Sequence, residues 1–448
     1  MRKSILLLLC ALLFLLSGCQ ADPAALLTLP RTEVQKELLP HQAASLLSGA
    51  VSYLTPGSGA LAGSAGEVDF DGDGVPELVS CLMRGEDPAV EIYRQTGDKP
   101  EFLARITGRG SGIDALYFPK LHTDGTVGIV VSWALEGSAL KGMTVCAWYD
   151  ERFETLYSGA AQEVLTADLD RDGSEEILYL TEDSAGTWQA VMLRYRSGGL
   201  YSSEPVKLSQ GLDPQRISVE NIGFDRSALI CEGPTASDGI VTDVILATDG
   251  QLRNIYCSSL TGVSDLTARD LPLYCTDVNK DGTVELPRPR VIEHENGSVT
   301  SIPMLVDWYR CDEFSEPIEL YTTYHQWEEG WFFRLPDRMR DSILPAPGVT
   351  ADDVSSTLFF LKADGEGSQR ALWEVYVLSG EDAETTAEIC VLQPLAAAEG
   401  RLYALRPYEI MDDYYTKTSL PQYFSLIDEA ELAEIPLDIQ DHPDGGIA

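Results

Sequence analysis

The chain has 448 residues, of which 71 are acidic and 32 basic, so its formal net charge at pH 7 is −39. This charge disfavours partners that attract clusters of Lys and Arg, namely nucleic acids and acidic lipid headgroups, and it favours cations. A chain of this length holds one large domain or two to three ordinary ones, so internal repeats have to be found before domains are counted.

Residues 1–18 have the pattern of an export signal. Two basic residues precede an apolar run from Ile5 to Leu16, which is too short to span a bilayer because a span takes about 20 residues. The run ends in Leu16-Ser17-Gly18-Cys19, which resembles a bacterial lipobox. The resemblance implies that the Cys19 thiol carries a lipid anchor and that the chain is held at the extracytoplasmic face of the cell membrane. An ordinary secretory signal with a chance cysteine is the alternative.

Residues 19–60 are predicted to form the lipidated N-terminus and a linker. Within it, the segment from Thr32 to Leu47 has the spacing of a short amphipathic helix, with Leu38, Leu39, Ala43 and Leu46 on one side. We interpret it as a spacer from the membrane. No later segment reaches 18 consecutive apolar residues, so lipid is the only membrane anchor that the sequence predicts.

An acidic motif recurs in the middle of the chain. Three intact copies begin at Asp69, Asp168 and Asp277, and two eroded copies begin at Lys120 and, with fewer matching residues, at Asn221. Successive starts are 51, 48, 53 and 56 residues apart. Each copy is followed by a strand-like apolar run, and most of these runs carry an aromatic residue; they are 90–93, 145–149, 192–195, 244–247 and 304–309.

Short strands, Gly and Asp turns and a repeat near 50 residues fit one four-stranded blade per repeat. A parallel β-helix needs a much shorter repeat. We therefore predict an all-β fold in which residues 61–330 form β-propeller repeats, with seven blades favoured in the whole propeller.

The repeat fades after Trp331, although 358–361, 373–376 and 389–392 still have the pattern of strands. Residues 331–432 leave room for two degenerate blades, which we prefer, or for a small appended β-rich domain. Residues 433–448 are polar and Gly-rich, and we predict a disordered tail.

Seven cysteines remain once Cys10 of the signal and Cys19 are set aside, and they are scattered through strand-like runs. We expect buried free thiols, with one or two disulfides left open. There is no CxxC pair, and the five histidines have no paired spacing, which argues against a zinc site.

Each intact motif has oxygen-bearing side chains at its first, third, fifth and ninth positions and Gly at its sixth, where Gly permits a sharp turn. Such an oxygen-rich loop suits Ca²⁺, a hard cation that takes 6–8 oxygen ligands. An EF-hand is excluded because its twelfth position requires Glu, whereas Ser80, Tyr179 and Arg288 stand there. The alternative is an Asp-Gly turn closed by side-chain to backbone hydrogen bonds without metal.

The loops, each followed directly by apolar residues, resemble the FG-GAP/VCBS repeats of integrin-α-type β-propellers over about residues 60–330. The Phe-Gly-Gly-Ala-Pro signature is visible in no copy, so the resemblance rests on the loop and the period. It implies calcium between two strands of a blade, and no ion where Lys120 replaces the first carboxylate. The ligands implied are Asp69, Asp71, Asp73 and Glu77; Asp168, Asp170, Asp172 and Glu176; and Asp277, Asn279, Asp281 and Glu285.

These features predict a membrane-anchored lipoprotein with structural calcium, acting as a non-catalytic module that binds an unknown protein or glycan ligand, or as an envelope scaffold. The alternative is a secreted propeller enzyme, a polysaccharide lyase or glycosidase, because two carboxylates suffice for glycoside hydrolysis. No catalytic pair is nominated among so many acids. His325 lies among Tyr321, Tyr324, Trp327 and Trp331, a run that we interpret as core or a blade edge and, less favoured, as a carbohydrate platform.

Overall fold

The computed structural model describes residues 51–427, apart from 97–98, 150, 237–238, 293–303, 315, 337–339, 362–369 and 409–418. The predicted signal, Cys19, the helix predicted from Thr32 to Leu47 and the tail from residue 433 lie outside the described residues. No helix in the described part is long and apolar enough to cross a membrane.

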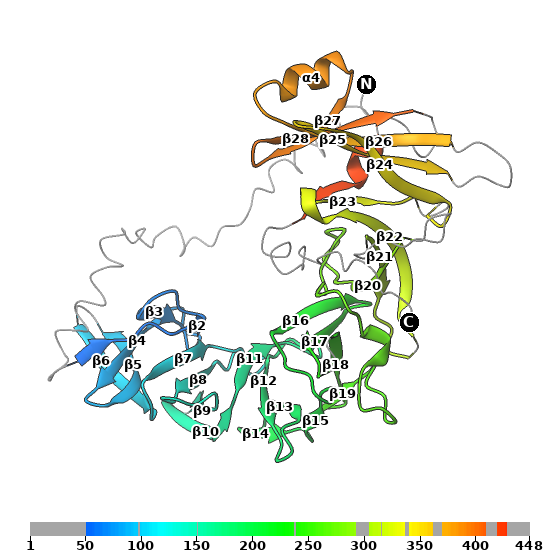
Figure 1. The fold of residues 1–448 in the computed structure, drawn as a ribbon. Coiled ribbons are helices and arrows are strands. Elements are labelled where there is room, and N and C mark those ends of the chain that lie inside the picture. The colour runs from blue at the N-terminus through cyan, green and yellow to red at the C-terminus, as the bar shows by residue number, and fades with distance from the viewer. Residues whose placement is uncertain are drawn as a thin grey trace, which may run out of the picture. The chain divides into compact units, whose positions relative to one another are not determined.

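The fold is all-β and propeller-like, as predicted, with successive sheets of four or five strands that are almost entirely antiparallel (Figure 1). The described residues form six sheets, where the sequence favoured seven blades. They divide into two compact units: residues 51–118 with 124–159, and residues 119–123 with everything from residue 160 onward.

The first unit contains two sheets. Sheet 1 consists of β1 (Val51–Tyr53), β3 (Ala65–Val68), β4 (Glu77–Arg84), β5 (Asp87–Thr96) and β6 (Lys99–Thr107). Sheet 2 consists of β2 (Ser58–Gly59), β7 (Gly112–Tyr117), β8 (Gly128–Ala134), β9 (Lys141–Tyr149) and β10 (Arg152–Ala161). The two share one core, in which the Phe70 ring meets Phe118 and Phe153 edge-on at centroid distances of 5.7 and 5.0 Å.

The second unit contains four sheets. Sheet 3 consists of β11 (Glu163–Ala167), β12 (Glu176–Glu182), β13 (Trp188–Arg196), β14 (Gly199–Ser202) and β15 (Val206–Lys207). Sheet 4 consists of β16 (Arg216–Gly223), β17 (Arg226–Pro234), β18 (Ile240–Thr248) and β19 (Gln251–Asn254). Sheet 5 consists of β20 (Leu286–Arg290), β21 (Leu305–Arg310), β22 (Ile318–Gln326), β23 (Trp331–Arg334) and β29 (Phe424–Leu426). Sheet 6 consists of β24 (Ile343–Ala351), β25 (Val354–Leu361), β26 (Arg370–Ser379), β27 (Gln393–Ala398) and β28 (Arg401–Pro407).

The repeat found in the sequence matches the sheets. In sheets 1 to 4 the motif copies connect two hydrogen-bonded neighbours: β3 to β4, β7 to β8, β11 to β12 and β16 to β17. The fifth copy leads into β20 and is closed by a single bridge between Thr276 and Glu285. The apolar runs predicted after each motif lie in β5, β9, β13, β18 and β21. These strands are apolar because they lie inside their sheets.

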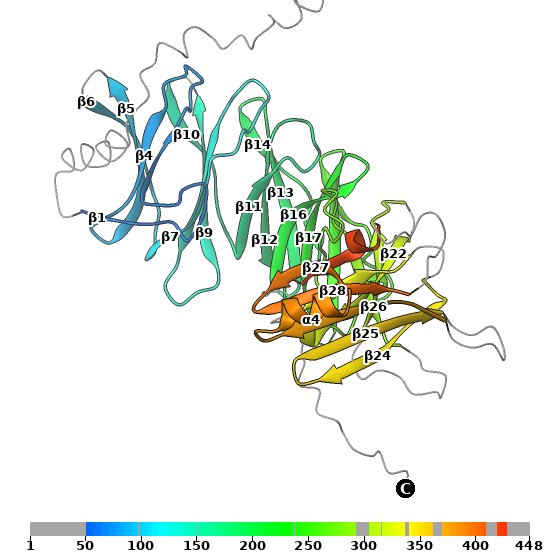
Figure 2. The same ribbon diagram turned by 90° about the horizontal axis from the view of Figure 1, so that it is seen from above.

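Sheet 6 departs from this pattern, since its spatial order is β24-β25-β26-β28-β27. The helix α4 (Ala383–Ile389) precedes β27, and Ala383 and Ala387 pack against Tyr376, Leu378 and Ala404 (Figure 2). The run 389–392, predicted as a strand, is therefore the end of this helix and the turn after it, because a short apolar run fits either element.

We preferred two degenerate blades after residue 330, and the described residues of this segment contribute to two sheets in a different way. β23 and β29 pair with each other and complete sheet 5, which leaves sheet 6 as the one further sheet among the described residues. Sheets 5 and 6 share an aromatic core, in which the Trp373 ring stacks on Phe359 and Phe333 at centroid distances of 4.9 and 5.2 Å. Three short 3₁₀ helices complete the described elements: η1 (Asp265–Thr267), η2 (Trp327–Glu329) and η3 (Leu420–Tyr423).

The cysteines of the described part are Cys81, Cys146, Cys231, Cys257, Cys275, Cys311 and Cys390, and all seven are free thiols. Five are buried, while Cys257 and Cys390 are half-buried. Burial raises the pKa of Cys81 to about 12, which keeps this side chain a neutral thiol.

His325 belongs to the core, as its aromatic neighbours indicated. Its side chain is 2% exposed, and its ring stacks on Trp327 at 4.3 Å and on Phe332 at 5.1 Å between centroids. Nε2 lies 2.8 Å from the Thr323 hydroxyl, while Nδ1 has no hydrogen-bond partner within the described part of the chain. Burial lowers the pKa of His325 to about 3, so the ring is neutral at pH 7.

His325 makes stability depend on pH in the acid range. The unfolded chain binds a proton near the ordinary pKa of 6.5, and the folded chain does so only near pH 3. The stability that the neutral ring provides is therefore fully present above pH 6.5 and is lost as the pH falls from 6.5 toward 3. We expect His325→Phe, which keeps a ring in the stack, to flatten the fall in the free energy of unfolding between pH 6.5 and 4.5, measured by urea titration. An unchanged slope would contradict this assignment.

Candidate metal centres

The three intact loops have one backbone arrangement. They are loop 1 (69–77), loop 2 (168–176) and loop 3 (277–285). The fourth residue has a positive φ in each, with values of 73°, 57° and 61°, as does the glycine at the sixth position, with values of 84°, 88° and 85°. A residue with a side chain is strained at a positive φ, so glycine at the sixth position follows from the turn, whereas Arg171 and Lys280 adopt the left-handed region at the fourth.

The first carboxylate of each loop closes the turn, because one of its oxygens accepts the backbone N–H of the sixth-position glycine. The distances from this nitrogen to Asp69, Asp168 and Asp277 are 3.0, 3.0 and 2.7 Å. The fifth residue accepts from the backbone N–H two residues later in every loop, at 2.7, 2.9 and 2.9 Å. These side-chain to backbone hydrogen bonds are the ones expected of an Asp-Gly turn without metal. They also hold the carboxylates in a fixed array.

The ninth residue lies beneath the loop. Glu77, Glu176 and Glu285 are 2%, 2% and 1% exposed. In each case Oε2 accepts the backbone N–H of the second loop residue, at 3.1, 2.9 and 3.2 Å. The other carboxylate oxygen, Oε1, is left for a second interaction. Glutamate at this position therefore ties the start of the loop to the strand that follows.

Carboxylate oxygens converge in two of the loops. Ligand atoms of Asp69, Asp71 and Glu77 all lie within 4.8 Å of one another, and so do those of Asp168, Asp170 and Glu176. In loop 3 the third residue is Asn279, whose Nδ2 donates to Asp281 at 2.9 Å and to Glu285 at 3.3 Å. The predicted ligands at the first, third and ninth positions are thus brought together in loops 1 and 2, without the fifth-position Asp73 and Asp172. In loop 3 the Asn279 amide joins the carboxylates of Asp281 and Glu285.

Two arginines that the sequence analysis missed enter loops 1 and 2. Arg94 contacts Asp71 and lies 3.2 Å from Glu77 Oε1. Arg194 lies 2.6, 3.0 and 3.4 Å from oxygens of Asp170, Asp172 and Glu176, its side chain being only 12% exposed. Both are found 25 or 26 residues after the first loop residue, in the strand that pairs with the ninth-position glutamate.

Loop 3 has no such arginine among the described residues. Arg310 follows Tyr309, which pairs with Leu286, and so has the register of Arg94 and Arg194. Its guanidinium instead lies over the Phe224 ring, 4.3 Å from the centroid.

The buried glutamates hold their protons more tightly than ordinary glutamates. Burial, followed by the negative charge of Asp170, raises the pKa of Glu176 to about 7. Burial is also the largest cause of the pKa of about 7 for Glu285, and it raises the pKa of Glu77. A bound cation stabilises the charged form of such groups, so metal binding at these loops releases protons below about pH 7.

The donor set fits a calcium ion. Oδ1 of Asp168 is buried and has no hydrogen-bond partner within the described residues, although it belongs to an acidic loop. A buried carboxylate oxygen without a partner is costly, and a cation removes the cost. Carboxylate oxygens are hard ligands of the kind that Ca²⁺ takes.

The eroded copies connect the loops of the second unit. Lys120 and Glu175 exchange two hydrogen bonds: the Lys120 N–H donates to the Glu175 carboxylate at 2.6 Å, and the Glu175 N–H donates to the Lys120 carbonyl at 2.7 Å. Arg171 of loop 2 donates to Asn221, and the Asn221 amide donates to the Gly282 carbonyl of loop 3 at 2.6 Å. The copy at Asn221 is itself a tight turn, with positive φ at residues 223, 224 and 225. Loops 2 and 3 are thus joined through the turn between them.

Comparisons with known proteins leave the family open. No family model matches the chain, and no curated protein matches it significantly. It is similar to Saccharomyces cerevisiae Sqt1, with 10% identity over 75% of this chain and 94% of that chain and a TM-score of 0.31. It is also similar to a protein of unknown function from Dyadobacter fermentans, with 12% identity over 80% of this chain and 98% of that chain and a TM-score of 0.28. A protein from Lactobacillus plantarum gives 8% identity over 73% of this chain and 86% of that chain, with a TM-score of 0.27. At these TM-scores the similarities carry no argument about fold or function.

Arg194 is expected to stabilise the metal-free protein and to compete with calcium. Arg194→Met leaves the buried Glu176 without its cation, so it should lower the free energy of unfolding in chelator by about 3 kcal/mol. Because a positive charge is removed from loop 2, the same variant should bind calcium more tightly in a titration. The control is Arg196→Met, an exposed arginine two residues along β13. Equal behaviour of the two variants would show that Arg194 has no special role.

Proposed function

We propose that this protein is a calcium-stapled binding module of the FG-GAP/VCBS type, held at the extracytoplasmic face of a bacterial membrane by lipid on Cys19. The observation that carries the proposal is the common geometry of the three loops. In each one, four oxygen-bearing side chains at fixed spacing lie on a turn closed by the same hydrogen bonds. The family assignment is supported by the loop and by the period of about 50 residues.

Calcium serves a structural purpose in this proposal. The residues proposed to hold it are the first, third, fifth and ninth of each loop. The ion neutralises carboxylates that the fold crowds together and fixes the turn between two strands. A ligand that binds only the folded state adds stability by mass action, about 2.7 kcal/mol when its concentration is 100 times its Kd. Extracytoplasmic fluids supply calcium at levels at which weak sites of about 10⁻⁴–10⁻³ M fill.

The proposed activity is binding of a protein or glycan ligand, without catalysis. Loops 2 and 3 are held in place by the hydrogen bonds that run through Asn221, and a rigid set of loops binds a ligand with little loss of conformational entropy. The net charge of −39 attracts only cations over long distances. A protein or glycan ligand is therefore recognised through its direct contacts with the module.

Calcium should raise the melting temperature. We expect a rise of several degrees on adding millimolar calcium to chelated protein, measured by calorimetry, because the ion binds only the folded loops. The triple variant Asp73→Ala, Asp172→Ala, Asp281→Ala should lose most of this rise. The control, Glu86→Ala, Glu136→Ala, Glu384→Ala, removes the same charge from exposed positions outside the loops and should keep it. No shift in the unaltered protein would overturn the calcium proposal.

The lipid anchor is tested separately. When the full chain is expressed in a bacterium, it should partition into detergent and into the membrane fraction, because diacylated proteins do so. Labelled fatty acid should be incorporated into the unaltered chain and into Cys81→Ala, but not into Cys19→Ala. Equal labelling of Cys19→Ala and the unaltered chain would exclude a lipid anchor at this residue.

A further inference from the structure

Beside loop 3 there is a cleft whose walls include two of the proposed calcium ligands, Asp277 and Asn279. A cavity of about 600 Å³ is continued by a second one of about 410 Å³, and Val278, Lys280, Phe332 and Ser425 line both. Cavities of about 300–1,000 Å³ are the size that holds small organic ligands. We call the two cavities together the loop-3 cleft.

One wall of the loop-3 cleft is a stack of rings. Phe332 lies against His325 with an interplanar angle of 18°, and His325 lies against Trp327 with an angle of 26°. The inner two rings are buried, while Phe332 is half-buried and lines both cavities. Phe424 of β29 adds a second half-buried ring to the larger cavity. Rings held this way form a flat apolar surface that needs no ordering when a ligand binds.

Two cations also line the loop-3 cleft, together with the carboxylate of Asp277. Lys280 is exposed at the fourth position of loop 3 and forms no ion pair within the described residues. At the same position of loop 2, Arg171 donates to Asn221 and Ser227, so the two loops use this residue differently. Arg334 lines the second cavity, its guanidinium 4.3 Å from the centroid of the Tyr321 ring. A lysine and an arginine beside an aromatic wall match a ligand that has both an apolar face and a carboxylate.

We propose that the loop-3 cleft binds an acidic saccharide. The C–H face of a sugar ring packs on Phe332, and the sugar carboxylate pairs with Lys280 and Arg334. This inference rests on the binding function proposed above and gives it a ligand class. His325, Trp327 and the core behind them are the rigid base of the wall rather than direct contacts.

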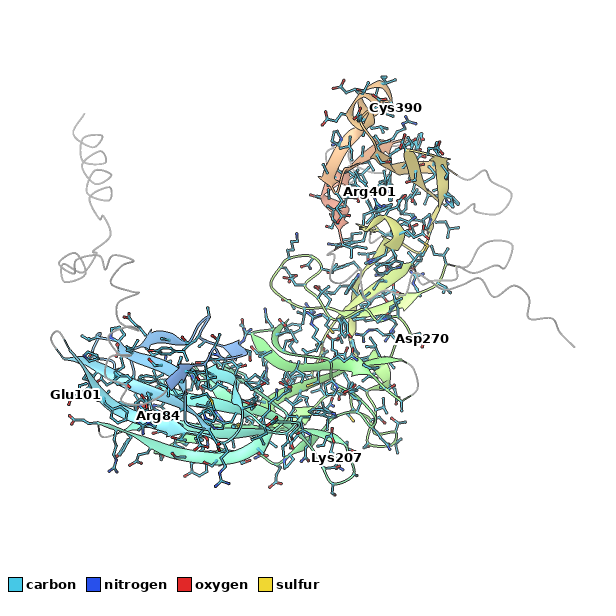
Figure 3. The ribbon with its side chains drawn as sticks, turned by 60° about the vertical axis from the view of Figure 1, so that its left-hand side comes forward. Arg84, Glu101, Lys207, Asp270, Cys390 and Arg401 are labelled. Carbon is cyan, nitrogen blue, oxygen red and sulfur yellow. The ribbon has the colours of Figure 1, made fainter. Side chains whose placement is uncertain are left out.

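The test is calorimetric titration of the full chain in detergent and calcium with two matched disaccharides, cellobiouronic acid and neutral cellobiose. The acidic disaccharide should bind about tenfold more tightly. Lys280→Asn removes the charge while suiting the left-handed backbone at this position, and should weaken acidic-disaccharide binding roughly five- to tenfold without changing cellobiose binding. The control is Lys207→Asn on β15, an exposed lysine in another sheet (Figure 3).

Phe332→Leu tests the aromatic wall. It should weaken both disaccharides by about tenfold, because both lose the ring surface. Its melting temperature is compared with that of the unaltered chain, and a folded variant that keeps full affinity would overturn the proposal. So would the absence of any binding at about 10 mM acidic disaccharide. The rise in melting temperature on adding calcium, measured in the same sample, separates the two proposals. A rise without saccharide binding rejects the cleft alone. Saccharide binding without a rise rejects the calcium sites alone.

Discussion

The structure depends on a buried carboxylate at the base of each acidic loop. Glu77, Glu176 and Glu285 each accept the backbone N–H of the residue seven positions earlier, and this bond joins the start of the loop to the next strand. The bond places the remaining carboxylates above the buried one, where they repel it and one another. The repulsion favours a positive charge at each loop, and the three loops differ in whether the chain itself supplies one.

Loops 1 and 2 already contain a cation, since Arg94 on β5 and Arg194 on β13 contact their carboxylates. Loop 3 has an amide at its third position instead, and the corresponding Arg310 lies on Phe224. An arginine and a calcium ion both neutralise the clustered carboxylates, so the two compete in loops 1 and 2. The arginines explain how the hairpins hold their shape without metal, and calcium adds to that stability in the proposed function.

Much of the fold was predictable because the repeat is local. The spacing of Asp, Gly and Glu within nine residues identified all three loops, and the apolar runs after them became central strands. Arg94 and Arg194 were missed because their meeting with the loops depends on hairpin register, which the spacing of the motif does not contain. The loop-3 cleft was out of reach for a similar reason, since Lys280 and Phe424 are brought together only by the addition of β29 to sheet 5. Sheet 6 lacks the motif, and its strand order, in which β28 lies between β26 and β27, has no counterpart in the repeat.

The most direct test of the account is anomalous X-ray scattering from crystals of the protein grown with calcium. The account predicts three peaks, one in each loop, with the carboxylate oxygens of the first and ninth residues at about 2.3–2.6 Å. It also predicts that the guanidinium groups of Arg94 and Arg194 move away from the ion. Loops without peaks, in which both arginines keep their contacts with Glu77 and Glu176, would contradict the account and leave the turns as metal-free, arginine-neutralised hairpins.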